Sequence, residues 1–331
     1  MSRPMSEAGE GAGRMSRRSL LATTALAAAT VVGGCAAAPA GTGPGAWAFR
    51  DDSGKLVTSR RRPESVLCYL GLAAALWDHG FRCAGTYSAL TSPDPDDRSI
   101  SGDLDRRAVP SFGDLWGQVR LEKIAAARPD LVIVGVMRGE PLLADHDLAG
   151  IERLAPTLRI EMHDRPLAAT LARVAELAGA LGGTDRDRGA KEYENAVAAL
   201  GRAVDARRDV RTAFVAGQTA GLDFNLVAFP TVRLVHDLGL PTVVPDSRGT
   251  AYTVKVSWEN VPRYPADLIL VDQRPYSRQP DQLAANPIWR RLPAVERRQV
   301  AAWNPEPVLS YAGVAKELQH LAEVLNGARH L

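Results

Sequence analysis

The chain has 331 residues, with 40 basic and 38 acidic side chains and a formal net charge of +2 at pH 7. This near balance excludes the basic excess with which nucleic-acid-binding proteins hold a polyanion, so no nucleic-acid partner is expected. The length is enough for two domains of about 100–200 residues each once an N-terminal segment is set aside.

That N-terminal segment, residues 1–34, has the layout of an export signal. Adjacent Arg17 and Arg18 precede an apolar run from Leu20 to Val32, which is shorter than the ~20 residues that span a bilayer. The arginine pair resembles a twin-arginine signal, and the residues up to Cys35 resemble a bacterial lipobox. We therefore predict export and a lipid anchor on Cys35 that holds the protein at the outer face of the cell membrane.

Residues 35–46 are rich in Ala, Gly and Pro, a composition typical of a flexible tether. The fourteen residues before Met15 resemble neither a signal nor a domain, so translation can start at Met1 or at Met15. Beyond the tether only Cys68 and Cys83 remain, too few for a disulfide framework. Whether these two thiols are bridged stays open.

Short β-rich runs alternate with helical patterns from residue 62 onward, which predicts βαβ units and a parallel sheet. In the first half we expect strands at 65–69, 81–88 and 131–136, with helices at 72–80 and 121–130. Apolar residues at spacings of three and four predict a helix over Leu167–Leu181, and a second helix follows over about 187–204. Alternation then resumes, with strands at 211–217, 266–273 and 299–303 and helices at 231–239, 283–292 and the C-terminus. The fold class is therefore α/β, as two lobes with helical material between them.

Catalytic and metal-binding motifs are missing from the sequence. There is no G-x-S-x-G, G-x-G-x-x-G or phosphate-loop pattern, and the six histidines are scattered with no zinc spacing. Nothing here identifies an enzyme or a protein-bound metal, so we predict neither a catalytic residue nor a cofactor.

Aromatic, arginine and amide side chains instead follow the predicted strands. In parallel sheets, ligands bind just beyond the carboxyl ends of the strands. Such side chains offer flat apolar surface together with hydrogen-bond donors, which suits a bulky ligand with outward-facing oxygens. The candidate ligand-binding residues are Tyr69, Tyr87, Trp116, Arg138, Gln218, Tyr252, Arg274, Tyr276 and Trp303.

Three segments carry a family resemblance. "RLEKIAAARPDLVIVG" is similar to an N-L-E-K-I-x-x-x-x-P-D-L-V-I stretch, with Arg120 in place of the usual Asn, and "ALWDHGFRCAGTY" and "SWENVPRYPADLILVD" match neighbouring units. With the lipobox, the chain from Trp47 to its C-terminus resembles the substrate-binding lipoproteins of iron–siderophore ABC importers. These belong to the periplasmic-binding-protein group with a rigid interdomain helix.

The resemblance implies two Rossmann-like α/β lobes, 47–164 and 185–331, joined by a long helix within 165–184, with the ligand cleft between the lobes. It implies a non-enzymatic receptor for a ferric siderophore, which we expect to be of the hydroxamate type. Arg138 and Arg274 would then donate to the chelate oxygens, while aromatic side chains pack its organic shell. These aromatic residues are Trp116, Tyr252 and Trp303. Iron would arrive already wrapped in chelator oxygens, so the protein need supply no metal ligand.

In this family one glutamate in each lobe docks onto arginines of the membrane permease, which works with its ATPase. By motif position these are Glu122 and Glu259, and the receptor is expected to act as a monomer. Two carboxylates a lobe apart can set orientation through charge complementarity. Each also lies near the first turn of a predicted helix, where an acid favours the helix dipole and Ser257 could cap. Both roles can hold together.

Other ligands and another class of protein stay open. Haem would need an axial Tyr or His, for which Tyr69 or Tyr87 could serve. Cobalamin is a further candidate ligand, and an exported lipoprotein enzyme on the same two-lobed scaffold is the rival outside the binding class.

Overall fold

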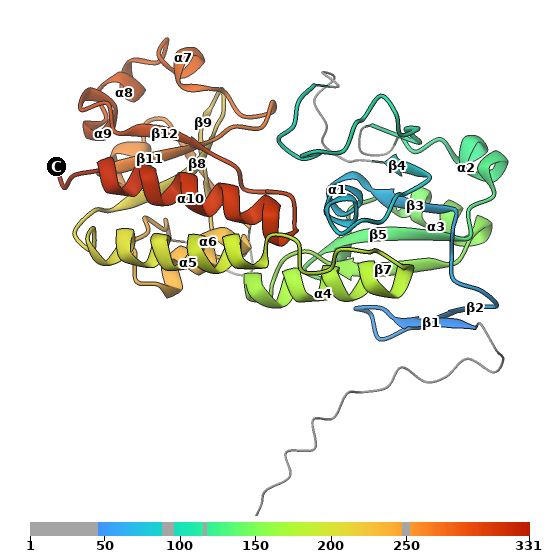
Figure 1. Ribbon diagram of the computed structural model, residues 1–331. Helices are drawn as coiled ribbons and strands as arrows, with labels where there is room; N and C mark the ends of the chain where they lie inside the picture. The colour runs from blue at the N-terminus through green and yellow to red at the C-terminus, as the bar shows by residue number, and fades with distance from the viewer. Residues whose placement is uncertain (1–45, 88–95, 115–117, 247–251) are drawn as a thin grey trace, which may run out of the picture. The chain divides into compact units, whose positions relative to one another are not determined.

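The computed structural model describes residues 46–87, 96–114, 118–246 and 252–331 of the chain (Figure 1). The predicted export signal, the lipidation site at Cys35, the tether up to residue 45 and the ligand-binding candidate Trp116 lie outside the described residues. Within the described ranges, no helix combines the length and the apolar character that crossing a membrane requires.

The first sheet lies in the N-terminal half of the chain. Its strands are β3 (Val66–Tyr69), β4 (Gly85–Tyr87), β5 (Leu131–Met137), β6 (Glu140–Pro141) and β7 (Thr157–Glu161), with helices α1 (Leu70–Asp78), α2 (Leu121–Ala127) and α3 (Asp145–Leu154). The strand order is β4-β3-β5-β6, and β7 also pairs with β5. All pairs are parallel except β5 with the short β6. The apolar, β-branched run of β5 forms the buried centre of this sheet, as its sequence predicts.

The second sheet lies in the C-terminal half. Its strands are β8 (Thr212–Gly217), β9 (Gly221–Asn225), β10 (Thr253–Ser257), β11 (Leu268–Asp272) and β12 (Val300–Trp303), in the order β10-β9-β8-β11-β12. Strands β8, β11 and β12 are parallel, whereas β9 and β10 are antiparallel to their neighbours. The helices of this half are α6 (Pro230–Asp237), the 3₁₀ turn η1 (Val261–Arg263), α7 (Pro280–Leu283), α8 (Pro287–Arg290), α9 (Pro293–Glu296) and α10 (Tyr311–Gly327). Two mainly parallel sheets with helices confirm the predicted α/β class.

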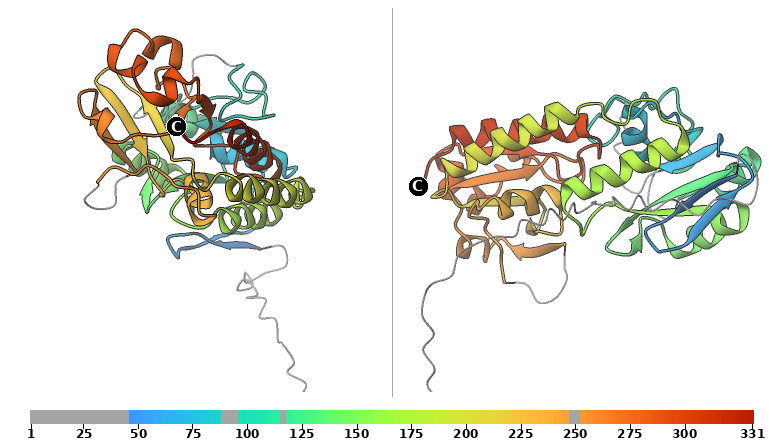
Figure 2. Two further views of the ribbon diagram at one scale, coloured as in Figure 1. Left: turned by 90° about the vertical axis from the view of Figure 1, so that its left-hand side faces the viewer. Right: turned by 60° about the horizontal axis from the view of Figure 1, so that its bottom comes forward.

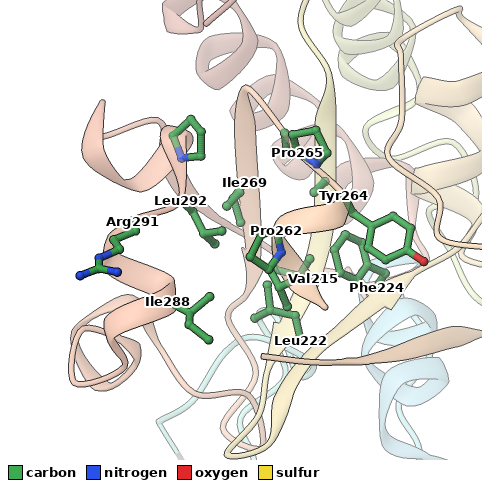
Figure 3. A pocket seen from close by; sticks show the side chains of 14 residues that line it. Val215, Leu222, Phe224, Pro262, Tyr264, Pro265, Ile269, Ile288, Arg291 and Leu292 are labelled. Atoms are coloured by element: carbon green, nitrogen blue, oxygen red, sulfur yellow. The ribbon is translucent and has the colours of Figure 1, made fainter. Parts of the chain in front are cut away.

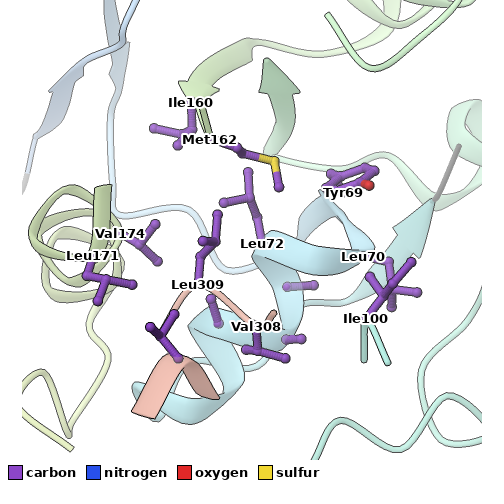
Figure 4. Close-up of a cluster of buried hydrophobic side chains, with 14 of the residues drawn as sticks. Tyr69, Leu70, Leu72, Ile100, Ile160, Met162, Leu171, Val174, Val308 and Leu309 are labelled. Carbon is purple, nitrogen blue, oxygen red and sulfur yellow. The ribbon is translucent and has the colours of Figure 1, made fainter. Parts of the chain in front are cut away.

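Two helices connect the sheets, α4 (Leu167–Leu181) and α5 (Ala190–Asp205) (Figure 2). Helix α4 falls within the range 165–184 predicted for the connecting helix, and it contacts both α1 and α6. It ends at Gly182, whose φ of +91° a side chain would oppose. Figure 4 shows Leu171 and Val174 of α4 beside Leu72 of α1 and Leu309. One buried cluster thus runs through both halves, and the predicted lobe limits stay predictions.

A hairpin that sequence periodicity did not predict precedes the first sheet. It consists of β1 (Trp47–Arg50) and β2 (Leu56–Ser59), which are too short for a periodic signal. The carboxylate of Asp52 in its turn accepts a hydrogen bond from the backbone N–H of Glu161 (2.7 Å). It also pairs with Arg173 (3.0 Å) and Arg165 (3.3 Å). The hairpin is therefore fastened to β7 and to the connecting helix.

Two predicted elements are corrected by the structure. Among the described residues of the expected strand 81–88, only Gly85–Tyr87 form a strand, so Cys83 precedes it, and both Cys68 and Cys83 are free thiols. The expected helix 283–292 is instead the set of one-turn helices α7, α8 and α9, each beginning with a proline. Proline suits the first turn of a helix but cannot sit in its interior, so each one starts a new turn and ends the preceding one.

Asp267, which ties the C-terminus to the second sheet, should make stability depend on pH. Burial alone would raise the pKa of Asp267, but hydrogen bonds from Arg211 and the backbone N–H of Leu331 lower it to about 2, from 3.8. Because the pKa of Asp267 is lower in the folded chain than in the unfolded chain, the ionised carboxylate stabilises the fold fully above pH 4. This stabilisation is lost as pH falls through 2. We expect Asp267→Asn to cost about 2 kcal/mol at pH 7 and roughly half of that at pH 3.

Urea unfolding of both proteins between pH 7 and pH 3 measures this difference. Asp209→Asn, at an exposed aspartate of the same half, is the control and should unfold like the original chain at each pH. A difference for Asp267→Asn that does not change with pH would show that lost packing, and not charge, causes the destabilisation.

Candidate ligand-binding site

The carboxyl ends of parallel strands from the two sheets come together between the two halves of the molecule. Tyr69 ends β3, His163 follows β7, and Glu306 follows β12, and the three residues line one enclosed cavity of about 10 Å³. That space holds about one water molecule. The strand ends of both sheets therefore lie together, as the parallel topology predicts for a ligand site.

A larger, open cavity of about 440 Å³ lies beside this small cavity, and two predicted residues, Arg138 and Tyr252, line it. Arg138 follows β5 with a φ of +54°, and its backbone N–H donates to Glu161 (2.9 Å). Its guanidinium lies over the ring of Tyr252, 5.6 Å from the ring centroid. Because Arg138 comes from the first half and Tyr252 from the second, this cavity is shared by both.

Tyr252 stands beside a histidine that the sequence did not predict. The ring of His163 is 6.0 Å from Tyr252 and 5.4 Å from Phe229, and its Nδ1 has no hydrogen-bond partner in the structure. Burial lowers the pKa of His163 to about 4, so the ring is neutral at pH 7. Among the described residues, the buried hydroxyl of Tyr252 also has no hydrogen-bond partner, and burial raises its pKa. Unpaired buried polar atoms are rare in native proteins, so these atoms are available to a ligand or water.

Gln218 and Tyr276 line a second open cavity, of about 600 Å³, at the turn between β8 and β9. Asp223 and Lys255 lie in the same lining. Tyr276 is 43% exposed, and its hydroxyl donates to Asp272 (2.9 Å). This cavity places two more predicted residues at the carboxyl end of the second sheet, but not in contact with Arg138.

Arg274 is only 3% exposed, and most of its donors are already used. Its guanidinium bonds to Asp272 (2.7 Å) and to the hydroxyl of Tyr276 (2.8 Å), and it pairs with Glu306 at 2.9 Å. The two carboxylates hold the pKa of Arg274 above its usual value despite burial. Arg274 thus holds Asp272, Tyr276 and Glu306 together beneath the candidate site. Its expected contact with the ligand stays a prediction.

Three other predicted residues lie in the core. The hydroxyl of Tyr87 donates to the backbone carbonyl of Ile133 (2.9 Å), so an axial bond to haem would break a buried hydrogen bond. Trp303 is fully buried and packs on Phe214 with ring centroids 4.8 Å apart. Tyr69 lines the small enclosed cavity, and it is buried, with only 2% of its surface exposed. These side chains therefore pack beneath the candidate site and do not form its surface.

The two predicted docking glutamates are exposed, and one lies in each half of the molecule. Glu122 lies in the first turn of α2, as expected. Glu259 precedes η1 and is not in an α-helix, so Ser257 does not cap one. Instead, the Ser257 hydroxyl donates to Glu259 (2.6 Å), which lowers the pKa of that carboxyl. Glu259 is therefore ionised and open to a cationic partner.

The described residues hold no group of three or more His, Cys, Asp or Glu side chains placed to bind a metal ion. The cavities around Arg138 and around Gln218 carry a mixed charge: Arg138 and Lys255 against Glu140, Asp164 and Asp223. The arrangement can enclose a bulky molecule with aromatic faces and a guanidinium.

Comparisons with known proteins agree with this architecture. A family model described as periplasmic binding protein matches residues 68–307. The ferric-siderophore receptor protein DesE from Streptomyces coelicolor is 29% identical, with a TM-score of 0.80 over 86% of this chain and 99% of that chain. Two more distant structures show the fold alone. FeuA, the triscatecholate siderophore binding protein of Bacillus subtilis, is 17% identical (TM-score 0.64, covering 85% and 98%). SirA of Staphylococcus aureus, complexed with staphyloferrin B, is 19% identical (TM-score 0.59, covering 86% and 99%). Among curated proteins, none matches the chain.

Proposed function

The chain belongs to the periplasmic binding protein family, and on that premise we propose that it captures a ferric siderophore outside the cytoplasm for an ABC importer. The observation that carries the proposal is the cavity shared by Arg138 and Tyr252, because one residue comes from each half of the molecule. The likeness to the receptor DesE supports the ligand class.

Charge favours a hydroxamate ligand over a catecholate ligand. Three catecholates leave a ferric complex with three negative charges, whereas three hydroxamates neutralise the iron. Among the described residues, the cavities around Arg138 and around Gln218 together hold two cations and three carboxylates, so they offer no positive excess to a triply charged anion. A neutral complex with outward oxygens fits one guanidinium and aromatic faces better.

Delivery completes the proposed role. A lipid on Cys35 would keep the receptor at the membrane after twin-arginine export, and the exposed Glu122 and Glu259 would meet arginines of the permease. Their separation on the two halves supports this role, because a permease that contacts both can read the orientation of the whole receptor.

Replacing Arg138 by alanine should weaken ligand binding without harming the fold. The side chain is half-buried, stacks on Tyr252 and has no carboxylate partner among the ion pairs of the described residues. Loss of a charge-assisted hydrogen bond costs about 1.5–3 kcal/mol, which corresponds to roughly a 10- to 100-fold weaker Kd. Titration with a ferric trihydroxamate, followed by tryptophan fluorescence and calorimetry, measures this change.

Arg153→Ala, at an exposed arginine of α3, is the matched control and should bind normally. Parallel titrations use a ferric tricatecholate, haem, cobalamin and the iron-free chelator. Preference for the tricatecholate would overturn the charge argument, and binding of haem alone would overturn the siderophore proposal. Unchanged affinity in Arg138→Ala would remove this cavity from the ligand site.

A further inference from the structure

A separate apolar cavity of about 440 Å³ lies on the opposite face of the second sheet (Figure 3). Its floor includes Val215 of β8, Phe224 of β9 and Ile269 of β11. Because side chains alternate along a strand, Phe214 points to the other face, where it packs on Trp303. The cavity is therefore distinct from the site between the two halves.

The walls of this cavity come from short elements that cover the sheet incompletely. Pro262 of η1 and Tyr264, the residue after it, stand on one side, and Ile288 of α8 and Leu292, which precedes α9, stand on the other (Figure 3). A one-turn helix lays few side chains on a sheet, so apolar floor between the walls remains uncovered. The volume lies within the ~300–1,000 Å³ range of small-molecule sites.

Cationic side chains lie along the same elements. Arg291 is the charged residue of the lining, and Figure 3 shows its guanidinium at the outer edge, directed away from the apolar floor. The segment 287–298 holds four arginines and a single glutamate, and Arg263 lies in the facing wall element. Across the part of the chain that the structure describes, none of these five arginines takes part in an ion pair.

We propose that this cavity is a second binding site, for a single-chain anionic amphiphile such as a fatty acid. The acyl chain would fill the cavity, and its carboxylate would meet the guanidinium of Arg291 in the forked geometry that arginine favours. A free chain fits better than a bilayer surface, because the exposed large apolar residues lie elsewhere (Leu154, Val244, Tyr276 and Leu331) and none lines the cavity. This site is independent of siderophore capture.

Decanoate and decanol are the probes that test the site, since they share a chain and differ in charge. The full chain is titrated below the micellar concentration by calorimetry and by the fluorescence of Trp289, which is next to Ile288 in α8. We expect one decanoate per chain. Ile288→Trp should weaken binding of both probes by occupying part of the cavity, and Arg291→Gln should weaken decanoate about tenfold while leaving decanol unchanged.

Arg60→Gln, at an exposed arginine after β2, is the control for lost charge and should bind both probes normally. The unfolding midpoint and ferric-ligand affinity of each variant report whether the fold and the other site are intact, and Arg291→Gln tests the proposal even if Ile288→Trp does not fold. Absence of saturable binding, or unchanged decanoate affinity in both variants, overturns the proposal. Binding to phosphatidylglycerol vesicles without binding of free decanoate overturns it in favour of a membrane surface.

Discussion

Alanine at both Glu122 and Glu259 is expected to abolish uptake of the ferric ligand while leaving its Kd for the receptor unchanged. Both carboxylates are exposed, lie on different halves of the molecule, and line neither the cavity around Arg138 nor the cavity around Gln218. Their loss should therefore remove the contacts with the permease, and within the receptor it removes the surface hydrogen bond that the Ser257 hydroxyl donates to Glu259. Truncation of a charged pair at an interface costs about 2–5 kcal/mol, so two such losses reduce docking at least ~1,000-fold.

Radioactive iron uptake by cells that carry the variant as their sole receptor measures this loss, beside fluorescence titration of the purified variant. The matched control is alanine at both Glu192 and Glu323, which are exposed glutamates of α5 and α10. Uptake in the control should equal that of the original chain. Normal uptake in the Glu122 and Glu259 variant, or a weaker Kd, would contradict the docking role.

Strand-end reasoning anticipated part of the candidate site because parallel topology decides which residues meet. The buried run of β5 and the apolar stripe of α4 are strong signals, and their positions in the structure match the sequence-based expectation closely. Arg138 follows β5, so its place at the carboxyl edge of the first sheet came from the strand itself. Its contact with Tyr252 required the second half to face the first, which the family resemblance implied.

The rest of the site depends on elements without a strong local signal. His163 was missed because it follows β7, a strand whose segment TLRIE carries charges at two of its five positions. The sequence also did not reveal which strand-end side chains are buried: Tyr87 and Trp303 are the last residues of β4 and β12, and both are buried in the core. Sequence order shows where a strand ends, but which face its last side chain joins depends on packing from other elements.

Arg274 shows the same limit most clearly, and its replacement by methionine should have the largest effect on stability. Asp272 is fully buried and Glu306 is 8% exposed, and both pair with this guanidinium. Removing one partner from a buried ionic group leaves uncompensated charge and costs about 3–5 kcal/mol. We expect a loss of that size in the free energy of unfolding, measured by urea at pH 7.

Arg278→Met, at an exposed arginine of the same loop, should unfold like the original chain. Adding Glu306→Gln to Arg274→Met should recover part of the lost stability, because it removes one of the two charges left unpaired. If Arg274→Met instead kept its stability and lost affinity for the ferric ligand, the guanidinium would be a ligand donor, as the sequence predicts. The carboxylates that surround Arg274 favour the first result, since a donor held by Asp272, Glu306 and Tyr276 must break existing contacts before it can reach a ligand.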